Sequence, residues 1–550
     1  MPRSVSPLVT RAAIVAALVR DSFDVLVVGG GITGAGVARD AALRGLRVAL
    51  VEQDDFASGT SSRSSRLVHG GVRYLEHAQL ALVFESSRER RTLLRIAPHL
   101  VRPLAFTWPV YAGARVTRWQ LAAALTLYDV LALFRNVTRH ARLSAAGVIA
   151  HEPRLRREAL RGGARYHDAA TDDARLTLAT ALSARDAGAV LVNHARVESF
   201  LRHGDRITGA RIRDQFGTAT VDIRARVVVN ATGPWSDRTE ALAGSGGSGH
   251  VRGSKGVHVA VPRDRVGNTD AITLIAPQDG RVMFVLPAGD FTIIGTTDTY
   301  EAVAPDEVRA AAADVVYLLD AANHYFPEAH LERGDVISAW AGLRPLAASG
   351  AQRGDPGTVS REHTIAERVS GLVSVTGGKL TTYRSMAAEV VDAVQRALGQ
   401  PRTRSTTASR PLSGGKGCDV AREIALGTEA VGDAALATRL VHAHGTHWRS
   451  VWSQAERDET LAERIEPYRP YIVAELRYAV DHELALTLGD LLIRRVPVAF
   501  ETRDHGRAAA RRMAPLVGAW LGWSADETTA AVTSYDREVQ RIFAIEPTPG

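Results

Sequence analysis

Apolar residues follow two different periods along this chain, and each period predicts its own kind of sheet. Residues 25–28 form an unbroken apolar run before a glycine turn, and residues 46–51 form a second, mostly apolar run. Short runs without polar alternation are typical of parallel strands that are covered on both faces. Similar runs at 189–192 and 226–229 predict that the same sheet continues later in the chain.

Between residues 253 and 299 the apolar period changes to two, which is typical of antiparallel strands with one buried face. Asp-Gly and Gly-Asp pairs at 279–280 and 289–290 provide the turns. The alternating runs are 257–261, 271–275, 282–286 and 292–295. A second, antiparallel domain is therefore predicted.

The remaining patterns are helical. Residues 80–96 have the spacing of a surface helix, and the chain beyond a Ser, Thr, Gly and Pro-rich linker at 401–417 is helical throughout. Residues 119–134 are nearly all apolar apart from Asp129, with arginines on both sides. This segment is either a helix in a membrane interface, with its basic flanks over anionic headgroups, or a buried helix of the globular body.

These patterns predict an α/β fold with a Rossmann-like dinucleotide-binding domain, an antiparallel-sheet substrate domain and an all-helical C-terminal domain. The expected division is 1–110 and 166–250 for two parts of the dinucleotide-binding domain, 111–165 for a cap, 251–360 for the substrate domain, 361–400 for a return to the first domain, 401–417 for the linker and 418–550 for the helical domain.

The first strand and helix are joined by Gly29, Gly31 and Gly34 in the spacing G-x-G-x-x-G. Such glycines allow a tight turn, a close approach of the backbone to a pyrophosphate, and packing of helix on strand. Glu52 ends the second strand, where an acid binds a ribose hydroxyl. A second glycine turn at 231–233 indicates FAD rather than NAD, because the longer cofactor crosses the sheet and is gripped twice.

Composition narrows the class of protein. The 550 residues are 45% hydrophobic, which is enough for two or three domains, and no uncharged apolar run is long enough to span a bilayer. The net charge of +7 favours anionic partners. Against 64 arginines stand only three lysines, Lys255, Lys379 and Lys416, so each lysine is a candidate for a point charge at a specific site.

We expect no metal site. Cys418 is the single cysteine, which excludes an internal disulfide and a cysteine-cluster metal site and fits a reducing compartment. His442, His444 and His447 lie close together in sequence, but no acid or cysteine completes a ligand set. We interpret them as a solvated turn.

The polar, glycine-rich loop at 58–74 carries the most specific signal. Its run S-S-R-S-S-R-L-V-H-G-G-V-R-Y-L-E at 61–76 resembles that of the FAD-dependent glycerol-3-phosphate dehydrogenase family. Further runs resemble the same family in the same order, at 168–176, 254–258, 295–298, 342–346 and 360–365. The resemblance extends from about residue 20 to the end of the helical domain. Arg66 stands where the family often has lysine, and the linker at 413–416 matches only loosely.

The resemblance implies roles for particular residues. The catalytic candidates are His69, His258 and Arg344, among which the residues alone do not select the base. The substrate-binding candidates are Arg73, Tyr74, Arg344, Arg361 and Lys379, because a dianionic phosphate requires several cations. The cofactor-binding candidates are Gly29, Gly31, Ile32, Thr33, Gly34, Glu52, Thr60, Ser61, Ser62, His69, Gly70, Gly71, Val197, Ala231, Gly233, Gly378, Lys379, Leu380 and Thr381.

The implied reaction is oxidation of sn-glycerol 3-phosphate to dihydroxyacetone phosphate by non-covalently held FAD, with electrons passed to a membrane quinone. This would place a cytoplasmic protein peripherally on the anionic inner face of the cell membrane, with a homodimer as one candidate for its oligomeric state. Oxygen is the alternative acceptor. A flavin amine oxidase would need only a carboxylate clamp and therefore fewer cations. A nucleic-acid-binding flavoprotein is disfavoured because only 6% of the residues are aromatic.

Overall fold

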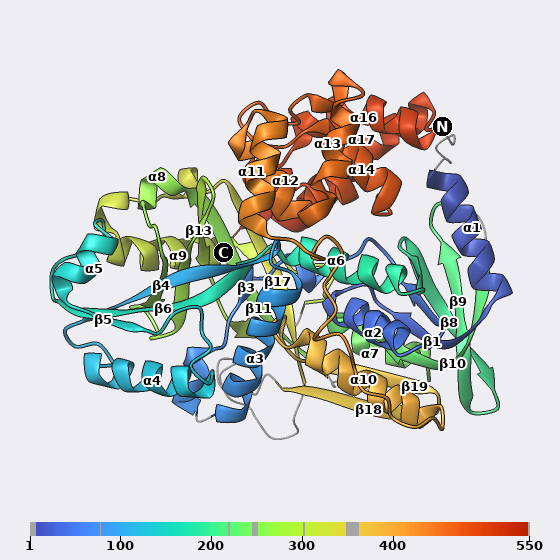
Figure 1. Cartoon of the computed structure of the whole chain (residues 1–550), viewed down its shortest axis with the longest axis horizontal. Helices are drawn as coiled ribbons and strands as arrows, with labels where there is room; N and C mark the ends of the chain where they lie inside the picture. The colour runs from blue at the N-terminus through green and yellow to red at the C-terminus, as the bar shows by residue number, and fades with distance from the viewer. Residues whose placement is uncertain are drawn as a thin grey trace.

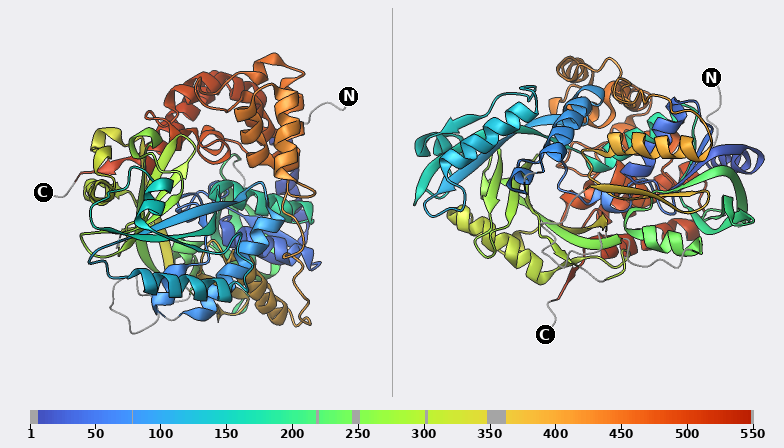
Figure 2. Two further views of the ribbon diagram at one scale, coloured as in Figure 1. Left: turned by 60° about the vertical axis from the view of Figure 1, so that its left-hand side comes forward. Right: turned by 90° about the horizontal axis from the view of Figure 1, so that it is seen from below.

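The computed structural model describes residues 7–77, 79–217, 220–244, 251–300, 303–347 and 362–547. Two sheets lie side by side along the long axis, and the C-terminal helices cover one side of both (Figure 1). Figure 2 shows the same layering from two other directions, with helices α3 and α4 on the side away from the helical domain.

The first sheet forms from the runs that lack polar alternation. Its strand order is β18-β19-β10-β1-β2-β7, with β8 and β9 attached beside β10. The five central strands run parallel, and Val25 to Leu26 of β1 are fully buried between helices on one face and a hairpin and helix on the other. The strands are β1 (Ser22–Val28), β2 (Val48–Val51), β7 (Val190–Val192), β8 (Ala195–His203), β9 (Arg206–Asp214), β10 (Thr220–Asn230), β18 (His363–Val369) and β19 (Leu372–Gly377).

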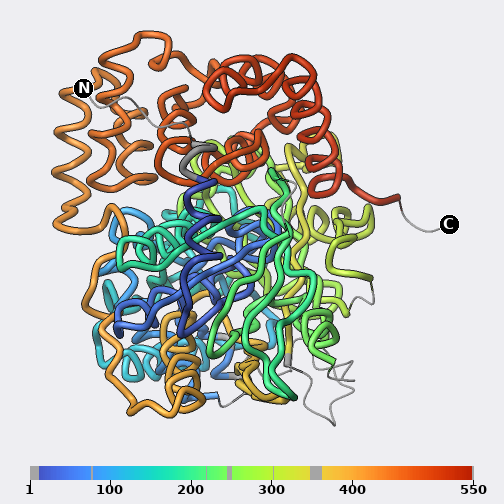
Figure 3. Tube along the Cα trace, turned by 90° about the vertical axis from the view of Figure 1, so that its right-hand side faces the viewer, coloured from blue at the N-terminus to red at the C-terminus, as the bar shows by residue number. Residues whose placement is uncertain are grey.

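Helices cover this sheet on both faces, which explains its continuous apolar strands. One face packs against α2 (Ile32–Leu43), α6 (Asp173–Asp186) and α10 (Tyr383–Ala397). The other face packs against α1 (Pro7–Arg20) and the β8–β9 hairpin, with α7 (Ser236–Leu242) close by. Figure 3 shows this domain from its outer side, beneath the helical domain.

The second sheet contains the alternating strands. Its order is β15-β11-β14-β13-β12-β4-β6-β3, with β17 beside β11 and β5 beside β6. The strands are β3 (Leu67–Val68), β4 (Val101–Tyr111), β5 (Ala141–Leu143), β6 (Leu160–Thr171), β11 (Val251–Pro262), β12 (Ala271–Ile275), β13 (Val282–Ala288), β14 (Phe291–Gly295), β15 (Thr299–Tyr300) and β17 (Ser338–Ala347). The helices of this domain are α3 (Leu80–Ile96), α4 (Arg118–Leu131), α5 (Ala145–His151), α8 (Arg263–Val266) and α9 (Ala312–Tyr325).

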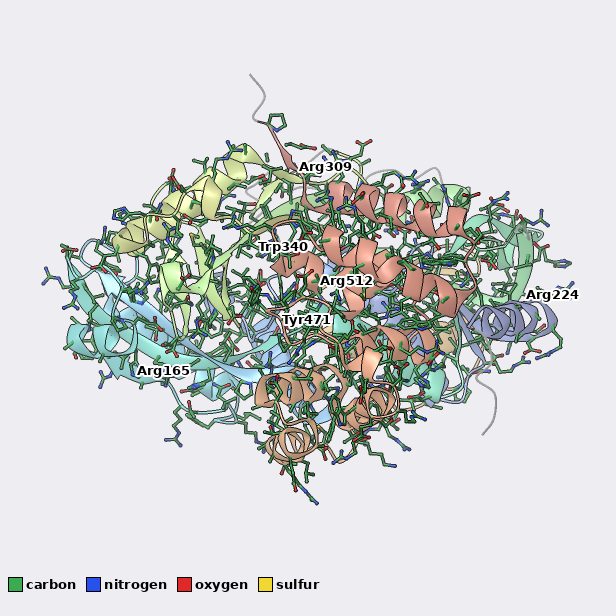
Figure 4. The ribbon with its side chains drawn as sticks, turned by 90° about the horizontal axis from the view of Figure 1, so that it is seen from above. Arg165, Arg224, Arg309, Trp340, Tyr471 and Arg512 are labelled. Carbon is green, nitrogen blue, oxygen red and sulfur yellow. The ribbon has the colours of Figure 1, made fainter. Side chains whose placement is uncertain are left out.

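The helical domain comprises α11 (Val420–Val431), α12 (Ala434–His444), α13 (Trp448–Ala455), α14 (Val473–His482), the π-helix η9 (Asp490–Arg495), α15 (Val498–Glu501), α16 (Arg507–Leu521) and α17 (Ala525–Phe543). The last strand, β20 (Ile545–Glu546), pairs with β16 (Ala310–Ala311) of the second domain. In Figure 4, Tyr471 of this domain and Trp340 of β17 lie near the centre, while Arg165 and Arg224 mark the two opposite sheets.

The structure differs from the expected division at one place. Strands β4 and β6 pair along their whole length and belong to the second sheet, so residues 101–171 extend that sheet and 111–165 is not a separate cap. The sequence concealed this because long-range pairing of β4 with β6 leaves no local signal. Residues 220–230 form one continuous strand, β10, which extends the predicted run 226–229 at its N-terminal end.

Candidate functional site

The candidate site is a cavity of about 600 Å³ at the carboxyl ends of the parallel strands. The segments that follow β1, β2, β10 and β19 line it, together with residues of β11 and β17 from the second sheet. Ligands of open α/β sheets bind at this edge, because the loops there diverge and helix N-termini point outward. The cavity therefore lies between the two sheets.

The turn after β1 presents backbone to this cavity. Gly29 has a φ of 108°, which favours glycine, and Gly31, the residue before α2, provides no side-chain cap. The Ile32 amide donates to Oγ of Ser61 at 3.0 Å. A Cβ on Gly34 would overlap the carbonyl oxygen of Gly29, so this glycine allows the helix to pack against the turn. The exposed start of α2 is suited to a pyrophosphate.

Glu52 lies at the end of β2 on the same wall of the cavity. Its Oε2 accepts from the Gly30 amide at 2.6 Å, and its Oε1 accepts from the Asp54 amide at 2.9 Å. Burial raises the pKa of this carboxyl to about 7, because desolvation disfavours its charged form. Ala195 to Glu198, the segment that includes Val197, line the cavity beside Glu52. This end suits the ribose and adenine of a dinucleotide.

The other end of the cavity collects cationic and aromatic groups. Lys379 Nζ lies 3.5 Å from the centroid of the Tyr74 ring, and the half-buried ring of His69 stacks on the same tyrosine at 6.4 Å. Lys379 follows β19, whereas Tyr74 and His69 belong to the loop of the family-like run. Residues far apart in sequence therefore meet here.

Arg344 reaches this end of the cavity from β17. Its Nη2 donates to Oγ1 of Thr296 at 2.9 Å, and its Nη1 lies 3.2 Å from Oδ1 of Asp298. A Cβ on Gly256, in the adjacent strand β11, would overlap the guanidinium. The glycine is therefore required at that position for Arg344 to lie across the strand.

His258 is buried beside Arg344 and lines the cavity. Its ring stacks on Trp340 at 5.5 Å, and its Nε2 lies 2.8 Å from Oγ of Ser65. Burial, followed by the positive charges of Arg344 and Arg66, lowers the pKa of His258 to about 3. The imidazole is thus neutral at physiological pH.

Most of the predicted residues lie on the cavity wall. They are Gly29, Gly31, Ile32, Thr33, Glu52, Thr60, Ser61, His69, Tyr74, Val197, Ala231, Gly233, His258, Arg344, Gly378, Lys379, Leu380 and Thr381. The side chain of Arg73 and the whole of Arg361 lie outside the described residues.

Four predicted cofactor contacts do not line the cavity. Gly34 faces Gly29 as described above, and Ser62 is buried in η1 (Thr60–Ser62) behind the wall. The Gly70 amide donates to Asp168 at 3.0 Å, away from the cavity, and Gly71 adopts a φ of 78° in the turn beneath Tyr74. These residues shape the loop rather than forming its inner surface.

Two further expectations change. Lys255 forms an ion pair with Asp314 at 3.2 Å and does not line the cavity, although the rarity of lysine had made it a candidate for a specific site. His444 does not lie in a solvated turn but is buried, with Nε2 3.4 Å from Glu475 and Nδ1 3.7 Å from Glu483. Pairing with distant acids, which the local sequence does not reveal, decides both cases.

Sequence reasoning missed several lining residues, among them Arg63, Ser65, Trp235 and Phe284. Ser65 stands within the family-like run, and Trp235 follows the second glycine turn, so both had a local signal. Phe284 is one apolar residue of the alternating strand β13, and no local sequence signal marks it as a cavity residue. As a whole, the cavity fits FAD, because the N-terminus of α2, a buried acid at the ribose end and a cationic far end all line it.

Comparisons with known proteins agree with this geometry. A family described as "FAD dependent oxidoreductase" matches residues 24–384, and one described as "C-terminal domain of alpha-glycerophosphate oxidase" matches residues 405–528. The chain is 41% identical over 532 residues to a glycerol-3-phosphate dehydrogenase of Mycobacterium leprae, covering 94% of this chain and 88% of that protein. It is 36% identical to a mitochondrial glycerol-3-phosphate dehydrogenase of Macaca fascicularis, covering 91% of this chain and 71% of the relative.

A solved structure is also similar over nearly its whole length. The glycerol-3-phosphate dehydrogenase of Bacillus halodurans, complexed with FAD, superposes with a TM-score of 0.81 at 32% identity and covers 98% of both chains.

Proposed function

Since the chain belongs to the FAD-dependent glycerol-3-phosphate dehydrogenase family, we propose that it oxidises sn-glycerol 3-phosphate to dihydroxyacetone phosphate. The observation that carries the proposal is the far end of the cavity, where the cations Arg344 and Lys379 lie with the neutral imidazole of His258. A phosphate monoester requires cations, and a secondary alcohol requires a base.

FAD, when bound, would supply the acceptor for the hydride at C2 of the substrate. The protein groups supply the rest of the chemistry. Arg344 and Lys379 attract the phosphate and fix the orientation of the carbinol carbon. His258 takes the hydroxyl proton, so that the carbinol oxygen becomes the carbonyl as the hydride departs. Ser65 and Trp340 hold the ring of His258 in place through the hydrogen bond and the stacking contact described above.

Reduction of the flavin by substrate tests this assignment. We expect glycerol 3-phosphate to remove the absorbance of the oxidised flavin under anaerobic conditions, while glycine, proline and unphosphorylated glycerol do not. A soluble quinone should then restore the absorbance at least about 10-fold faster than air-saturated buffer. Reduction by an amino acid in place of the phosphate ester would contradict the assignment. Faster reoxidation by air would instead identify an oxidase.

We further propose that the protein binds an anionic membrane surface, from which it reaches the quinone, and that α4 contacts this membrane surface. The inner face of α4 buries Leu121, Leu125 and Tyr128. Its outer face and the turn after it expose apolar side chains, with Trp119 75% and Phe134 54% exposed. The helix is therefore buried on one face, and its exposed apolar face supports the proposed membrane contact.

Charge around this face supports the same proposal. Arg115, Arg118, Arg135 and Arg139 are exposed around the apolar side chains, as expected for binding at anionic headgroups. The helix lies on the side of the molecule opposite the helical domain (Figure 1), which leaves the face open. Within the described parts of the chain, no helix is long and apolar enough to span a bilayer.

Vesicle binding tests the membrane proposal. Replacing Trp119 and Phe134 together by glutamine should weaken binding to vesicles with one anionic lipid in four by about 30-fold, since each replacement removes apolar burial of the order of 1 kcal/mol. Tyr468→Gln is the matched control, because Tyr468 is 94% exposed but belongs to the helical domain. Equal binding by all three proteins would contradict a role for α4.

A further inference from the structure

A buried cluster of charged residues joins the helical domain to the adenosine end of the cavity. We call Asp55, His194, Asp490, Arg494 and Arg495 the Asp55 cluster. Arg494 Nε donates to Oδ2 of Asp55 at 2.7 Å, and Arg495 donates to both Asp55 oxygens, at 2.6 Å and 3.0 Å. His194 Nε2 lies 2.9 Å from Oδ2 of Asp490. All five side chains are buried.

This cluster is an ion-pair network rather than a metal site. One ligand-type atom from each of Asp55, His194 and Asp490 lies within 4.8 Å of the others. The two guanidinium groups occupy the acceptor positions that a cation would use, because Arg494 and Arg495 both donate to Asp55 and Arg494 also donates to Asp490 at 2.8 Å. A metal ion would bring a further positive charge next to them.

The cluster is bonded to the wall of the FAD cavity through short backbone contacts. The His194 amide donates to the carbonyl of Asp54 at 2.5 Å, and the Ala195 amide donates to the carbonyl of Glu52 at 2.7 Å. Asn193 Nδ2 donates to Asp55 at 3.0 Å and to the carbonyl of Leu484, in the helical domain, at 2.9 Å. The two wall segments, 52–58 and 195–198, are thus held against each other from behind.

These segments are also bonded within the nucleotide-binding domain, since the Ala57 amide donates to the carbonyl of Gly30 at 3.2 Å and Val197 of β8 pairs with Ile212 of β9. The loop between β2 and η1 carries Glu52 at one end and Ser58 near the other, and both residues line the cavity. Asp55 lies in the middle of this loop and accepts four hydrogen bonds, three of them from the helical domain. Movement of Asp55 would therefore displace both cavity-lining ends of this loop.

We infer that the helical domain sets the affinity for FAD through the Asp55 cluster, whose members are positioning residues for the cofactor site. None of them lines the cavity. They act by fixing the loop that carries Glu52 and the segment that carries Val197. This inference rests on the FAD site and is independent of the proposed substrate.

The release of FAD from the holoprotein tests the inference. We expect Arg495→Met and Asp490→Asn to raise the FAD dissociation rate at least 10-fold, measured as the increase in flavin fluorescence after dilution. Arg469→Met is the control, because Arg469 also joins the helical domain to another domain, through Asp290 at 2.9 Å, and the hydrogen bonds described for it go to Asp290 and Glu501, outside the Asp55 cluster. It should change the rate by less than twofold. Release within twofold of the unmodified protein in both cluster variants would overturn the inference.

If the cluster only stabilised the fold, the FAD dissociation rate of each of the three variants would rise in step with the fall in its thermal midpoint. We therefore expect the cluster variants to release FAD faster even when their thermal midpoints match that of the control variant. Once saturated with FAD, they should show an unchanged KM for glycerol 3-phosphate. Failure of the proposed substrate to react would leave the FAD release rates unaffected, so the two failures are distinguishable.

Hydrogen exchange on the unmodified protein tests the same inference if the variants do not fold. Coupling is reciprocal, so FAD binding should slow exchange at residues 484–496 of the helical domain as well as at the cavity wall. Protection confined to the nucleotide-binding domain would overturn the inference without any substitution.

Discussion

Replacing His258 by asparagine is expected to slow flavin reduction by glycerol 3-phosphate at least 100-fold while leaving FAD content unchanged. Asparagine approximates the size of the ring but does not accept a proton, and loss of a general base costs about 10²- to 10⁴-fold. His258 lines the cavity between Ser65 and Trp340, and asparagine keeps a polar side chain at this position, so we expect the variant to retain FAD. Anaerobic stopped-flow at saturating substrate measures the reduction step apart from reoxidation.

His69 provides the comparison, because it lines the same end of the cavity. We expect His69→Asn to slow reduction by less than 10-fold, since its half-buried ring stacks on Tyr74 and is placed to orient rather than to accept the proton. If the His69 variant were slow and the His258 variant fast, the roles would have to be exchanged. If neither were slow, Arg344 would become the candidate.

The pH profile gives a second measure of the same assignment. Because burial lowers the pKa of His258 to about 3, its imidazole stays neutral between pH 8 and pH 6, and the limiting rate of flavin reduction should change by less than about twofold. A base with an ordinary imidazole pKa of about 6.5 would lose about three quarters of its neutral form over that range. A fourfold fall in rate would therefore argue against His258.

Replacing Arg344 or Lys379 by methionine should lower kcat/KM for glycerol 3-phosphate by about 10- to 150-fold. Each cation contributes a charge-assisted contact to the phosphate, worth roughly 1.5 to 3 kcal/mol. For Lys379 the loss should appear chiefly as a raised KM, because the lysine binds the phosphate alike in the ground state and the transition state. For Arg344, which lies beside His258, kcat should fall as well. Steady-state kinetics with a quinone acceptor separates the two parameters.

Lys255→Met is the matched control for these substitutions. Lys255 lies in the same strand as His258 and, like Lys379, is next to a glycine in the sequence. It pairs with Asp314. Its replacement should change kcat/KM by less than threefold. A loss as large as that of Lys379→Met would mean that charge in the domain as a whole, rather than contact with the phosphate, governs binding.

The sequence by itself determined the nucleotide-binding half of the molecule in some detail. Apolar runs predicted β1, β2, β7 and β10 and their parallel arrangement, and the spacing of Gly29, Gly31 and Gly34 predicted the turn that opens into the cavity. Glu52 followed from its place at the end of β2. These signals are local: strand period and turn conformation depend on a few neighbouring residues, so they are readable from one sequence.

Only the tertiary structure decided which charges face the site and which are paired elsewhere. Lys255 and Lys379 have similar local sequences, yet one pairs with Asp314 and the other lies against Tyr74 in the cavity. The low pKa of His258 arises from burial against Trp340 and the charge of Arg344, and both residues come from another strand. Desolvation and ion pairing depend on the groups that the fold brings within a few ångströms, and the chain's order does not record those distances.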